Sequence, residues 1–349
     1  MLEFDTLDEL WLNALGQCQE GDKTGSRDGA TTEVLGYAAR LKNPYAHFVF
    51  NPVRRLSPAY AAAEFLWYLS GTDSIKMISA YAKQYPRFTE DGKHAWGAYG
   101  HRWAADDAMR TQLFMCQQAG HVSLPTNAFF HDNNKGRPEF VTPLTQLQLA
   151  AWLLKKNSET RQAVMTMWNA GDLPHAIAGD KNDLPCTLSL NFIQRDSKLN
   201  LVCTMRSNDV WLGLPYDVFC MTSILLLVAE AIGAKPGWYQ HQATSMHLYD
   251  RNSVKAIQAL DVQYSTDAMK YTSHHAPLRE SIPYSVEAEK WIRGGKPVGQ
   301  DMTTRLGHGS LLEQCLAMVA TKWVSQDMAI SDLTNKKMKQ HMELLNADH

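Results

Sequence analysis

Two stretches with apolar residues at every second position, separated by a short polar segment, constrain the fold more than any other feature of the sequence. Apolar and polar residues alternate over 188–192 and again over 199–203, and the polar segment RDSK at 195–198 lies between them. A period of two is typical of a strand with one buried face, and the polar break is typical of a turn. The pattern predicts an antiparallel hairpin, and therefore a sheet at the centre of the fold.

Reactive and charged residues stand at the open end of this hairpin. Cys186 precedes the first strand, whereas Arg206 and Ser207 close the second. Because antiparallel pairing places the start of one strand beside the end of the other, we expect the thiol and an anion-binding pair to lie close together. A nearby positive charge makes a thiol a better nucleophile, so the hairpin predicts an active site at this end. The structural alternative is a cysteine that serves only as a small buried hydrophobic side chain.

The composition is that of an ordinary globular protein and narrows the classes of function. The 349 residues are 45% hydrophobic, and 34 Lys and Arg against 36 Asp and Glu leave a net charge of -2, which argues against a nucleic-acid-binding surface. The cysteines show no spacing typical of a metal site or a disulfide framework, so we expect neither. The acidic start MLEFDTLDEL lacks a signal-peptide core, and no apolar run predicts a membrane span, so we expect a cytoplasmic protein.

A second candidate catalytic group lies inside a predicted helix. Ser57 is a good N-cap, Pro58 suits the first turn and Gly71 supplies the stop, which predicts a helix over 57–71. Its interior is apolar nearly all round except for Glu64. Burial disfavours the charged form of a carboxyl and raises its pKa toward the range useful for proton transfer. The alternative is a glutamate that reaches solvent or pairs with an arginine.

Further elements follow from periodicity and from helix start and stop signals. A strand over 160–173 is expected to bury Val164, Met165 and Trp168. The remaining expected elements are a strand over 238–249 and helices over 1–17, within 142–159, over 218–232, and near 311–324 and 332–345.

Several short motifs resemble those of the thymidylate synthase superfamily. They are Leu-Pro before Cys186, the segment Arg206-Ser207-x-Asp209, the segment LGLPY at 212–216, and His247-x-Tyr249. They stand in the order and approximate spacing of that superfamily, and the resemblance extends over roughly residues 25–255. It implies transfer of a one-carbon unit from 5,10-methylenetetrahydrofolate to carbon 5 of a pyrimidine nucleotide, with Cys186 as the nucleophile that adds to carbon 6.

Other segments extend the resemblance. EFLWYLSGT resembles the element whose glutamate organises proton transfer, which implies this role for Glu64. The loop around Arg27 resembles a mobile phosphate-binding loop, and TRQAVMTMWN resembles the strand whose two arginines reach the phosphate in the partner subunit. Arg161 matches the first of those arginines, but Gln162 replaces the second.

The resemblance also assigns the remaining site residues. Arg206 and Ser207 are implied at the phosphate, and His247 and Tyr249 at the sugar, although a structural His-Tyr pair is the competing interpretation. The residues implied on the folate side are Trp96, Tyr99, Asp209 and Gly213. The aromatic residues of this set are equally compatible with a place in the core.

Asp217 departs from the synthase pattern. Thymidylate synthases carry Asn at this position, whereas the cytidylate hydroxymethylases of the superfamily carry Asp. Uracil presents a donor at N3 and an acceptor at position 4, and cytosine reverses both, which a protonated carboxyl or an N3-protonated base accommodates. The alternative role of Asp217 is to cap the helix that follows. Thr187 stands where synthases have His, and no Trp occurs between Trp67 and Trp96 to shield the intermediate from water.

The sequence therefore favours a deoxycytidylate or cytidylate 5-hydroxymethylase with methylenetetrahydrofolate as co-substrate and no metal. Reductive methylation of dCMP or dUMP is the first alternative, and a non-catalytic nucleotide- or RNA-binding homologue is the second. We expect an α+β fold with a mixed or antiparallel sheet, helices on one face and a homodimer interface on the other. The expected unit is one catalytic domain over 1–349, with an elaboration near 104–141 and an extended C-terminal region at 253–349.

Overall fold

The computed structural model describes residues 1–26, 28–104, 115, 130–132, 138–140, 145–263, 265–324 and 333–346. The strands of its main sheet are β1 (Leu2–Phe4), β2 (Asp22–Ser26), β3 (Gly29–Leu41), β6 (Val164–Thr166), β7 (Thr187–Arg195), β8 (Lys198–Asp209) and β9 (Lys235–Tyr249). They form a seven-stranded sheet in the order β1-β3-β9-β8-β7-β6, with β2 paired to β3. β4 (Phe130–Asp132) and β5 (Pro138–Phe140) form a separate two-stranded sheet.

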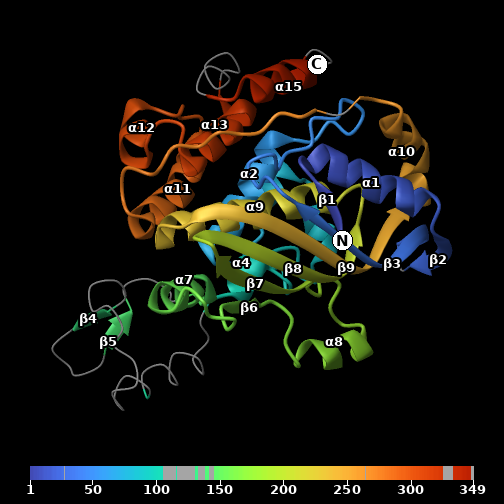
Figure 1. Ribbon diagram of the computed structural model, residues 1–349, viewed down its shortest axis with the longest axis horizontal. Helices are drawn as coiled ribbons and strands as arrows, with labels where there is room; N and C mark the ends of the chain where they lie inside the picture. Colours follow the sequence, from blue (N-terminus) through green and yellow to red (C-terminus); the bar gives the residue numbers. More distant parts are fainter. Residues whose placement is uncertain are drawn as a thin grey trace.

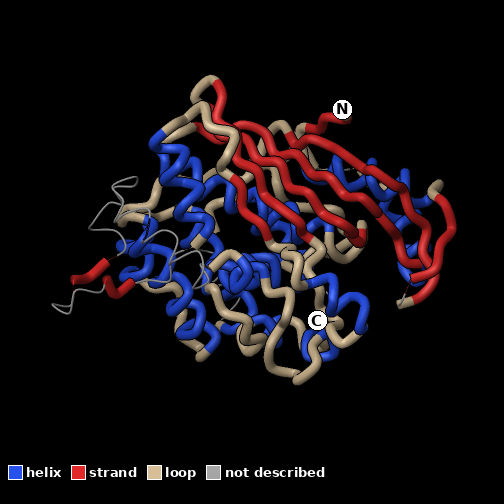
Figure 2. The backbone as a smooth tube through the Cα atoms, turned by 90° about the horizontal axis from the view of Figure 1, so that it is seen from below, coloured by secondary structure: helices blue, strands red, loops and turns tan. Residues whose placement is uncertain are grey.

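The main sheet is mixed, as expected. β1 runs parallel to β3, and β8 runs parallel to β9, while the other neighbours are antiparallel. Parallel neighbours need a crossover, and α9 (Leu214–Ile232) supplies it between β8 and β9. The long strands lie side by side along one side of the molecule, with helices behind them (Figure 2). The α+β class predicted from the sequence is confirmed.

The predicted hairpin is present as β7 and β8. Arg195 pairs with Lys198 across a two-residue turn, and Asp196 and Ser197 have φ angles of 50° and 60°. Two successive positive φ angles give the turn a twist that matches the right-handed twist of the strands. At the open end, the backbone N–H of Arg206 donates to the carbonyl oxygen of Cys186 at 2.8 Å. The predicted proximity of the thiol and the arginine is confirmed.

The remaining helices surround the sheet on one side and at its edge. α1 (Leu7–Gln19) and α9 pack against the strands, and α2 (Pro58–Ser70) packs against α9 (Figure 1). The others are α3 (Ile78–Tyr81), α4 (Tyr99–Arg102), α7 (Gln146–Lys156), α8 (Asp172–Ala178), α10 (Ser253–Leu260), α11 (Leu278–Arg293), α12 (Gln300–Leu306), α13 (Leu311–Trp323) and α15 (Lys336–Asn346), with 3-10 turns η1 (Tyr85–Phe88) and η2 (Asp250–Asn252).

Helix boundaries follow the capping residues. Ser57 accepts a hydrogen bond from the backbone of Tyr60 at the start of α2, and Gly71 ends the helix with a φ of 69°, as predicted. The expected helix over 1–17 is wrong at its start, because residues 2–4 form β1 and Thr6 caps α1. Thr6 and Glu9 form a reciprocal capping box, which fixes that helix start.

Three other expectations are corrected. Val164 is 41% exposed, because β6 is an edge strand on which only Met165 faces inward. Trp168 lies beyond the end of β6 and is only half-buried. The capping role of Asp217 is also wrong, because α9 begins at Leu214 and places Asp217 inside its first turn.

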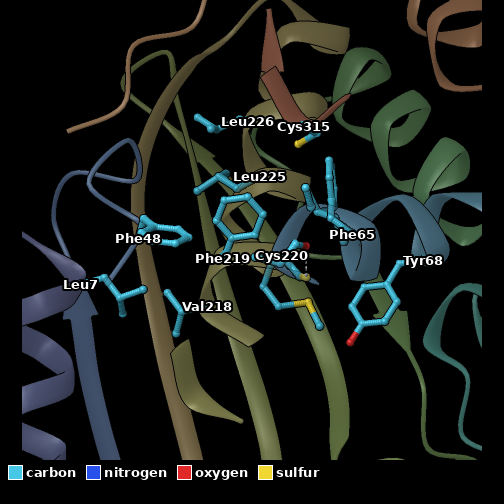
Figure 3. Close-up of a cluster of buried hydrophobic side chains, with 14 of the residues drawn as sticks. Leu7, Phe48, Phe65, Tyr68, Val218, Phe219, Cys220, Leu225, Leu226 and Cys315 are labelled. Atoms are coloured by element: carbon cyan, nitrogen blue, oxygen red, sulfur yellow. Dashed lines mark hydrogen bonds between the residues drawn. The ribbon is translucent and has the colours of Figure 1, made fainter. Parts of the chain in front are cut away.

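The apolar crossover helix α9 lies at the centre of the core. By length and composition it is the one helix in the described part of the chain that could cross a membrane, but 72% of its most apolar stretch is buried inside the protein, which is the placement of a core helix. Phe219 lies among apolar side chains from several elements (Figure 3). Tyr68 of α2 stands beside this cluster with its hydroxyl turned away from it (Figure 3).

The C-terminal region adds a helical layer beyond the sheet. α11 and α13 pack against α2 on the side away from the strands (Figure 1). α13 and α15 correspond to the two helices predicted near 311–324 and 332–345. The elaboration predicted near 104–141 lies almost entirely outside the described residues.

Candidate active site

A cavity of about 820 Å³ opens at the end of the sheet where β7, β8 and β9 meet α2 and α9. Most of the predicted site residues line it, although they come from five different elements. These residues are Glu64, Tyr99, Cys186, Arg206, Ser207, Asp209, Gly213, Asp217, His247 and Tyr249. The structure therefore brings together the candidate nucleophile, the candidate proton carrier and the candidate base-recognising acid.

Cys186 is partly exposed at this cavity, immediately before β7. Arg206 holds the loop that leads to it, because its guanidinium donates to the carbonyl oxygens of Pro185 at 2.9 Å and Leu184 at 3.0 Å. A cation is thus anchored beside the thiol on the neighbouring strand.

Glu64 projects from α2 into the cavity, and it is the only carboxyl on that helix. Tyr60, one helical turn earlier, donates a hydrogen bond to Oε1 of Glu64 at 3.1 Å, and Sγ of Cys220 lies 3.9 Å from Oε2. Burial raises the pKa of Glu64 to about 8, and the negative charge of Asp217 adds to the effect. A carboxyl with this pKa can take up and release a proton near neutral pH.

Asp217 enters the cavity from the first turn of α9. Burial is the main cause that raises its pKa to about 7, while the hydrogen bond from Asn208 opposes the rise. Nδ2 of Asn208 donates to Oδ2 of Asp217 at 2.7 Å. The charged and neutral forms of Asp217 are therefore both accessible near neutral pH, and one carboxyl oxygen already has a partner.

The ends of β8 and β9 contribute a second group of polar side chains. Asp209 pairs with His247 in the parallel register, and Oδ1 of Asp209 accepts from the backbone of Trp211 at 2.8 Å. Burial raises the pKa of Asp209 and lowers the pKa of His247. Oγ of Ser207 lies 3.4 Å from Nδ1 of His247, and the rings of His247 and Tyr249 are 5.3 Å apart.

Tyr99 and Trp96 were both predicted on the folate side, but the structure separates them. The hydroxyl of Tyr99 accepts a hydrogen bond from the backbone N–H of Thr187 at 3.1 Å, beside Cys186. Trp96 lines a different cavity of about 550 Å³ and donates to Asp172 at 3.0 Å. Gly97 lies between them, packed so tightly against the backbone of Asp183 that a Cβ there would come within 2.6 Å of its carbonyl oxygen.

Arg161, one of the predicted phosphate ligands, is not among the residues that line the cavity. Arg161 lies on the surface just before β6. Arg27 falls outside the described residues. Neither residue is therefore placed at the phosphate by this chain alone.

Several lining residues were not predicted from the sequence. They are Arg54, Tyr60, Lys181, Asn208 and Arg251. Tyr60 lies four residues before Glu64 on a helix, a spacing that was available as a signal. Three of these residues are cations that line the cavity together with Arg206 and could bind an anionic ligand.

The sequence also did not predict that the carboxyl of Asp183, near Cys186, is buried. Oδ2 of Asp183 is buried and has no hydrogen-bond partner among the described residues, and burial raises the pKa of this carboxyl to about 6. The remaining oxygen lies close to Gly97. No group of three His, Cys, Asp or Glu side chains in the described part of the chain is arranged to hold a metal ion.

Comparison with known proteins agrees with the site. The family model described as thymidylate synthase matches residues 13–276. A deoxyuridylate hydroxymethyltransferase of Bacillus phage SP01 is 29% identical over 246 residues, which are 69% of this chain and 56% of that protein. A deoxyuridylate hydroxymethyltransferase of Pseudomonas phage M6 is 26% identical over 286 residues, which are 78% of this chain and 68% of that protein. The chain thus spans little more than half the length of the first relative.

The family match covers well over half of the chain, and it includes every candidate catalytic residue that lines the cavity. On this evidence the chain belongs to the thymidylate synthase family.

Proposed function

We propose that this protein converts a pyrimidine nucleoside monophosphate, with deoxycytidylate as the preferred substrate, into its 5-hydroxymethyl derivative. The observation that carries the proposal is the convergence of Cys186, Glu64 and Asp217 on one cavity. The family membership supports one-carbon transfer. Two relatives named as hydroxymethyltransferases support release of the one-carbon unit as a hydroxymethyl group.

The substrate's phosphate is proposed to lie near Arg206 and Ser207. Arginine forms strong charge-assisted hydrogen bonds with phosphate, and the further cations Arg54, Lys181 and Arg251 line the same cavity. His247 and Tyr249 are proposed to contact the sugar. Their position at the end of β9 leaves the cavity's interior, with Cys186 and Asp217, for the base.

The same cavity is proposed to hold the co-substrate. Ligand sites are commonly about 300–1,000 Å³, so a cavity of about 820 Å³ has room for more than a nucleotide. Aromatic side chains in its wall suit a planar ring, and they include Tyr85, Phe88, Tyr99 and Tyr216. Asp209 and Gly213 also line it and remain proposed folate contacts, whereas Trp96 lies elsewhere.

The chain's own residues are proposed to act as follows. Sγ of Cys186 forms a bond to carbon 6 of the base, so that the electron pair of the 5,6 double bond becomes available at carbon 5. Methylenetetrahydrofolate, when bound, supplies the one-carbon unit. Carbon 5 then loses its proton, and the bond from the methylene carbon to the folate nitrogen breaks, so that tetrahydrofolate leaves. Glu64 takes a proton from a water molecule while the water oxygen bonds to the methylene carbon. The bond from Sγ of Cys186 to carbon 6 finally breaks, which restores the 5,6 double bond. The net change at carbon 5 replaces hydrogen by CH2OH and consumes one water.

Asp217 is proposed to recognise the base. Its neutral form offers one donor and one acceptor, which cytosine needs at N3 and at the 4-amino group. A pKa of about 7 keeps this form available. Uracil is the second candidate base, because both phage relatives are named for deoxyuridylate.

The test is incubation with dCMP, CMP and dUMP separately, each with methylenetetrahydrofolate, followed by mass measurement of the nucleotide. We expect a gain of CH2O with dCMP. A product from dUMP alone would overturn the role of Asp217, and a gain of CH2 with formation of dihydrofolate would indicate reductive methylation. A covalent adduct with a 5-fluoropyrimidine nucleotide would exclude a non-catalytic homologue.

We further propose a homodimer through the sheet face opposite α1 and α9. On β8 the side chains that face this way, Val202 and Thr204, are more exposed than Leu201 and Cys203, which point toward the helices. Arg161 lies on the surface next to β6, from which it would reach the phosphate in the partner's cavity. Sedimentation measurements test the assembly, and a monomer that retains full activity would contradict it.

A further inference from the structure

A line of buried hydrogen bonds leads from the interior of the sheet to Asp217. The hydroxyl of Tyr239 lies 2.9 Å from Nδ1 of His241, and Nε2 of His241 lies 3.0 Å from Oδ1 of Asn208. Nδ2 of Asn208 in turn donates to Oδ2 of Asp217 at 2.7 Å. Four side chains from three elements thus form one connected chain, with its far end out of contact with the cavity.

The chain is sealed from solvent behind the cavity. Tyr239 and His241 are fully buried, and Asn208 is 4% exposed. Burial lowers the pKa of His241 to about 3, so its ring is neutral at physiological pH and carries one N–H. A buried polar chain of this kind is stable only if each donor meets an acceptor.

These conditions fix the direction of every bond when Asp217 is charged. A carboxylate only accepts, so Asn208 must turn its NH2 group toward it and its oxygen toward His241. That oxygen needs a donor, which places the ring proton of His241 on Nε2. Nδ1 is then an acceptor, and the hydroxyl of Tyr239 is the donor that satisfies it.

The backbone at Gly213 leaves space for the contact between Asn208 and Asp217. A Cβ added to Gly213 would lie 2.9 Å from Nδ2 of Asn208 and 3.1 Å from Oδ2 of Asp217. Only glycine leaves room for these two atoms to meet beside the turn that starts α9.

We propose that Asn208 is a positioning residue that sets the base specificity of the cavity, and that Tyr239 and His241 keep its amide nitrogen turned toward Asp217. With Oδ2 held as an acceptor, a proton bound by the carboxyl sits on Oδ1. The carboxyl then presents its donor and its acceptor in a fixed order, which cytosine and uracil meet with opposite polarity. This inference rests on the proposed function, since it concerns how the proposed base-recognising residue works.

Other titratable groups also face Asp217 and are held constant in the test. They are Glu64 and Tyr68 from α2, Tyr85 from η1, Tyr99 from α4, Cys203 and Asp209 from β8, Cys220 from α9 and Tyr239 from β9. Among the substitutions below, only Tyr239→Phe touches this set, and it removes a hydroxyl that does not ionise near neutral pH.

The first measurement needs no catalysis. Nitrogen NMR of protein with labelled histidine, assigned by comparison with His241→Gln, reports which ring nitrogen carries the proton. We expect the proton on Nε2 of His241. A proton on Nδ1 would overturn the proposal, because the whole chain of donors would then run the other way.

The second measurement uses the specificity of the enzyme. In Asn208→Leu we expect the ratio of kcat/KM for dCMP over dUMP to fall about tenfold or more, because the proton of Asp217 is no longer confined to one oxygen. The high-pH limb of kcat/KM should also move to higher pH, since the lost hydrogen bond favoured the anion. Tyr239→Phe should also lower this ratio, although it keeps the hydrogen bond from Asn208 to Asp217.

Tyr271→Phe is the matched control. It removes a hydroxyl that lies 2.9 Å from a ring nitrogen of another buried, neutral histidine, His47. Neither residue lines the cavity. We expect an unchanged ratio and an unchanged pH profile. If Tyr239→Phe and Tyr271→Phe changed the specificity ratio and the pH profile equally, a general loss of stability would explain both changes, and the proposal would be overturned.

The outcomes also separate this inference from the function it rests on. If the unmodified protein forms no hydroxymethyl nucleotide from any substrate, the proposed function fails, while the NMR measurement still decides the direction of the chain. If product forms but Asn208→Leu and Tyr239→Phe both fold normally with unchanged specificity and pH profile, the positioning role alone fails. Should Asn208→Leu not fold, Tyr239→Phe and the NMR measurement decide.

Discussion

Replacing Glu64 by Gln is expected to abolish turnover and to stabilise the folded protein at alkaline pH. Gln keeps an oxygen that can accept the hydrogen bond from Tyr60, but it cannot ionise. Loss of general acid and base catalysis usually costs about 10²–10⁴-fold in rate. The free energy of unfolding at alkaline pH should instead rise, because the variant has no carboxylate charge to bury at this position.

The magnitude follows from the pKa of Glu64, which rises from 4.5 to about 8 on folding. Between these values the folded protein holds a proton that the unfolded chain has released, so the free energy of unfolding falls as the pH rises through this window. At about 1.4 kcal/mol per pH unit, the upper limit is roughly 5 kcal/mol. Glu64 keeps part of its surface open to the cavity, so we expect roughly 2–4 kcal/mol after allowance for solvent screening.

The assay is urea unfolding of the native and Glu64→Gln proteins at pH 5 and pH 9, with product formation measured in parallel. The difference in stability between the two proteins should be small at the lower pH and should grow toward the higher one. Glu289→Gln is the matched control, because Glu289 is equally confined to a helix but bonds to Arg293 at 2.8 Å and to Tyr81 at 2.7 Å. That variant should lose stability. A Glu64→Gln protein that is no more stable than the native one at pH 9 would refute the assignment of a desolvated carboxyl.

Three further substitutions test the site. Cys186→Ser should fold normally but lose both turnover and the covalent adduct with a 5-fluoropyrimidine nucleotide, which mass spectrometry detects. A variant that still turned over would contradict the assignment of Cys186 as the nucleophile. Asp217→Asn should keep the preference for dCMP over dUMP, because the NH2 of Asn208 holds the new amide oxygen in the place of Oδ2 and the amide NH2 then offers the same donor as the neutral carboxyl; a ratio of kcat/KM that shifts toward dUMP would count against this fixed orientation. Gly213→Ala should lower kcat/KM at least about tenfold, since its Cβ meets Asn208 and Asp217, whereas Gly25→Ala, with open space around it, should match the native enzyme.

Local patterns predicted the parts of the site that depend on one segment. The alternation on either side of the turn at 195–198 was enough to place Cys186 beside Arg206. The cap at Ser57 and the stop at Gly71 placed Glu64 inside an apolar helix, and the burial that this implies is what raises its pKa. In each case the neighbours that matter lie close in the sequence or across one tight turn.

Contacts that depend on strand register were beyond the sequence. Asn208 pairs in the sheet with Met246, and His241 pairs with Cys203, five residues earlier on each strand, yet the side chains of His241 and Asn208 meet. A period of two tells which face a residue takes, but it does not tell how far a parallel neighbour is offset. The separation of Trp96 from Tyr99 was hidden for a similar reason, because the bend at Gly97 is fixed by the loop before Cys186.

The helical layer formed by α11 and α13 determines how far the chain can be shortened. The thymidylate synthase match ends at residue 276, and both helices follow that point. They cover the outer side of α2, whose inner side carries Glu64. A protein trimmed to the matched segment would expose a large apolar strip to water and would invite self-association. The carboxyl of Glu64 therefore depends for its surroundings on a part of the chain that contributes no described residue to the lining of the cavity.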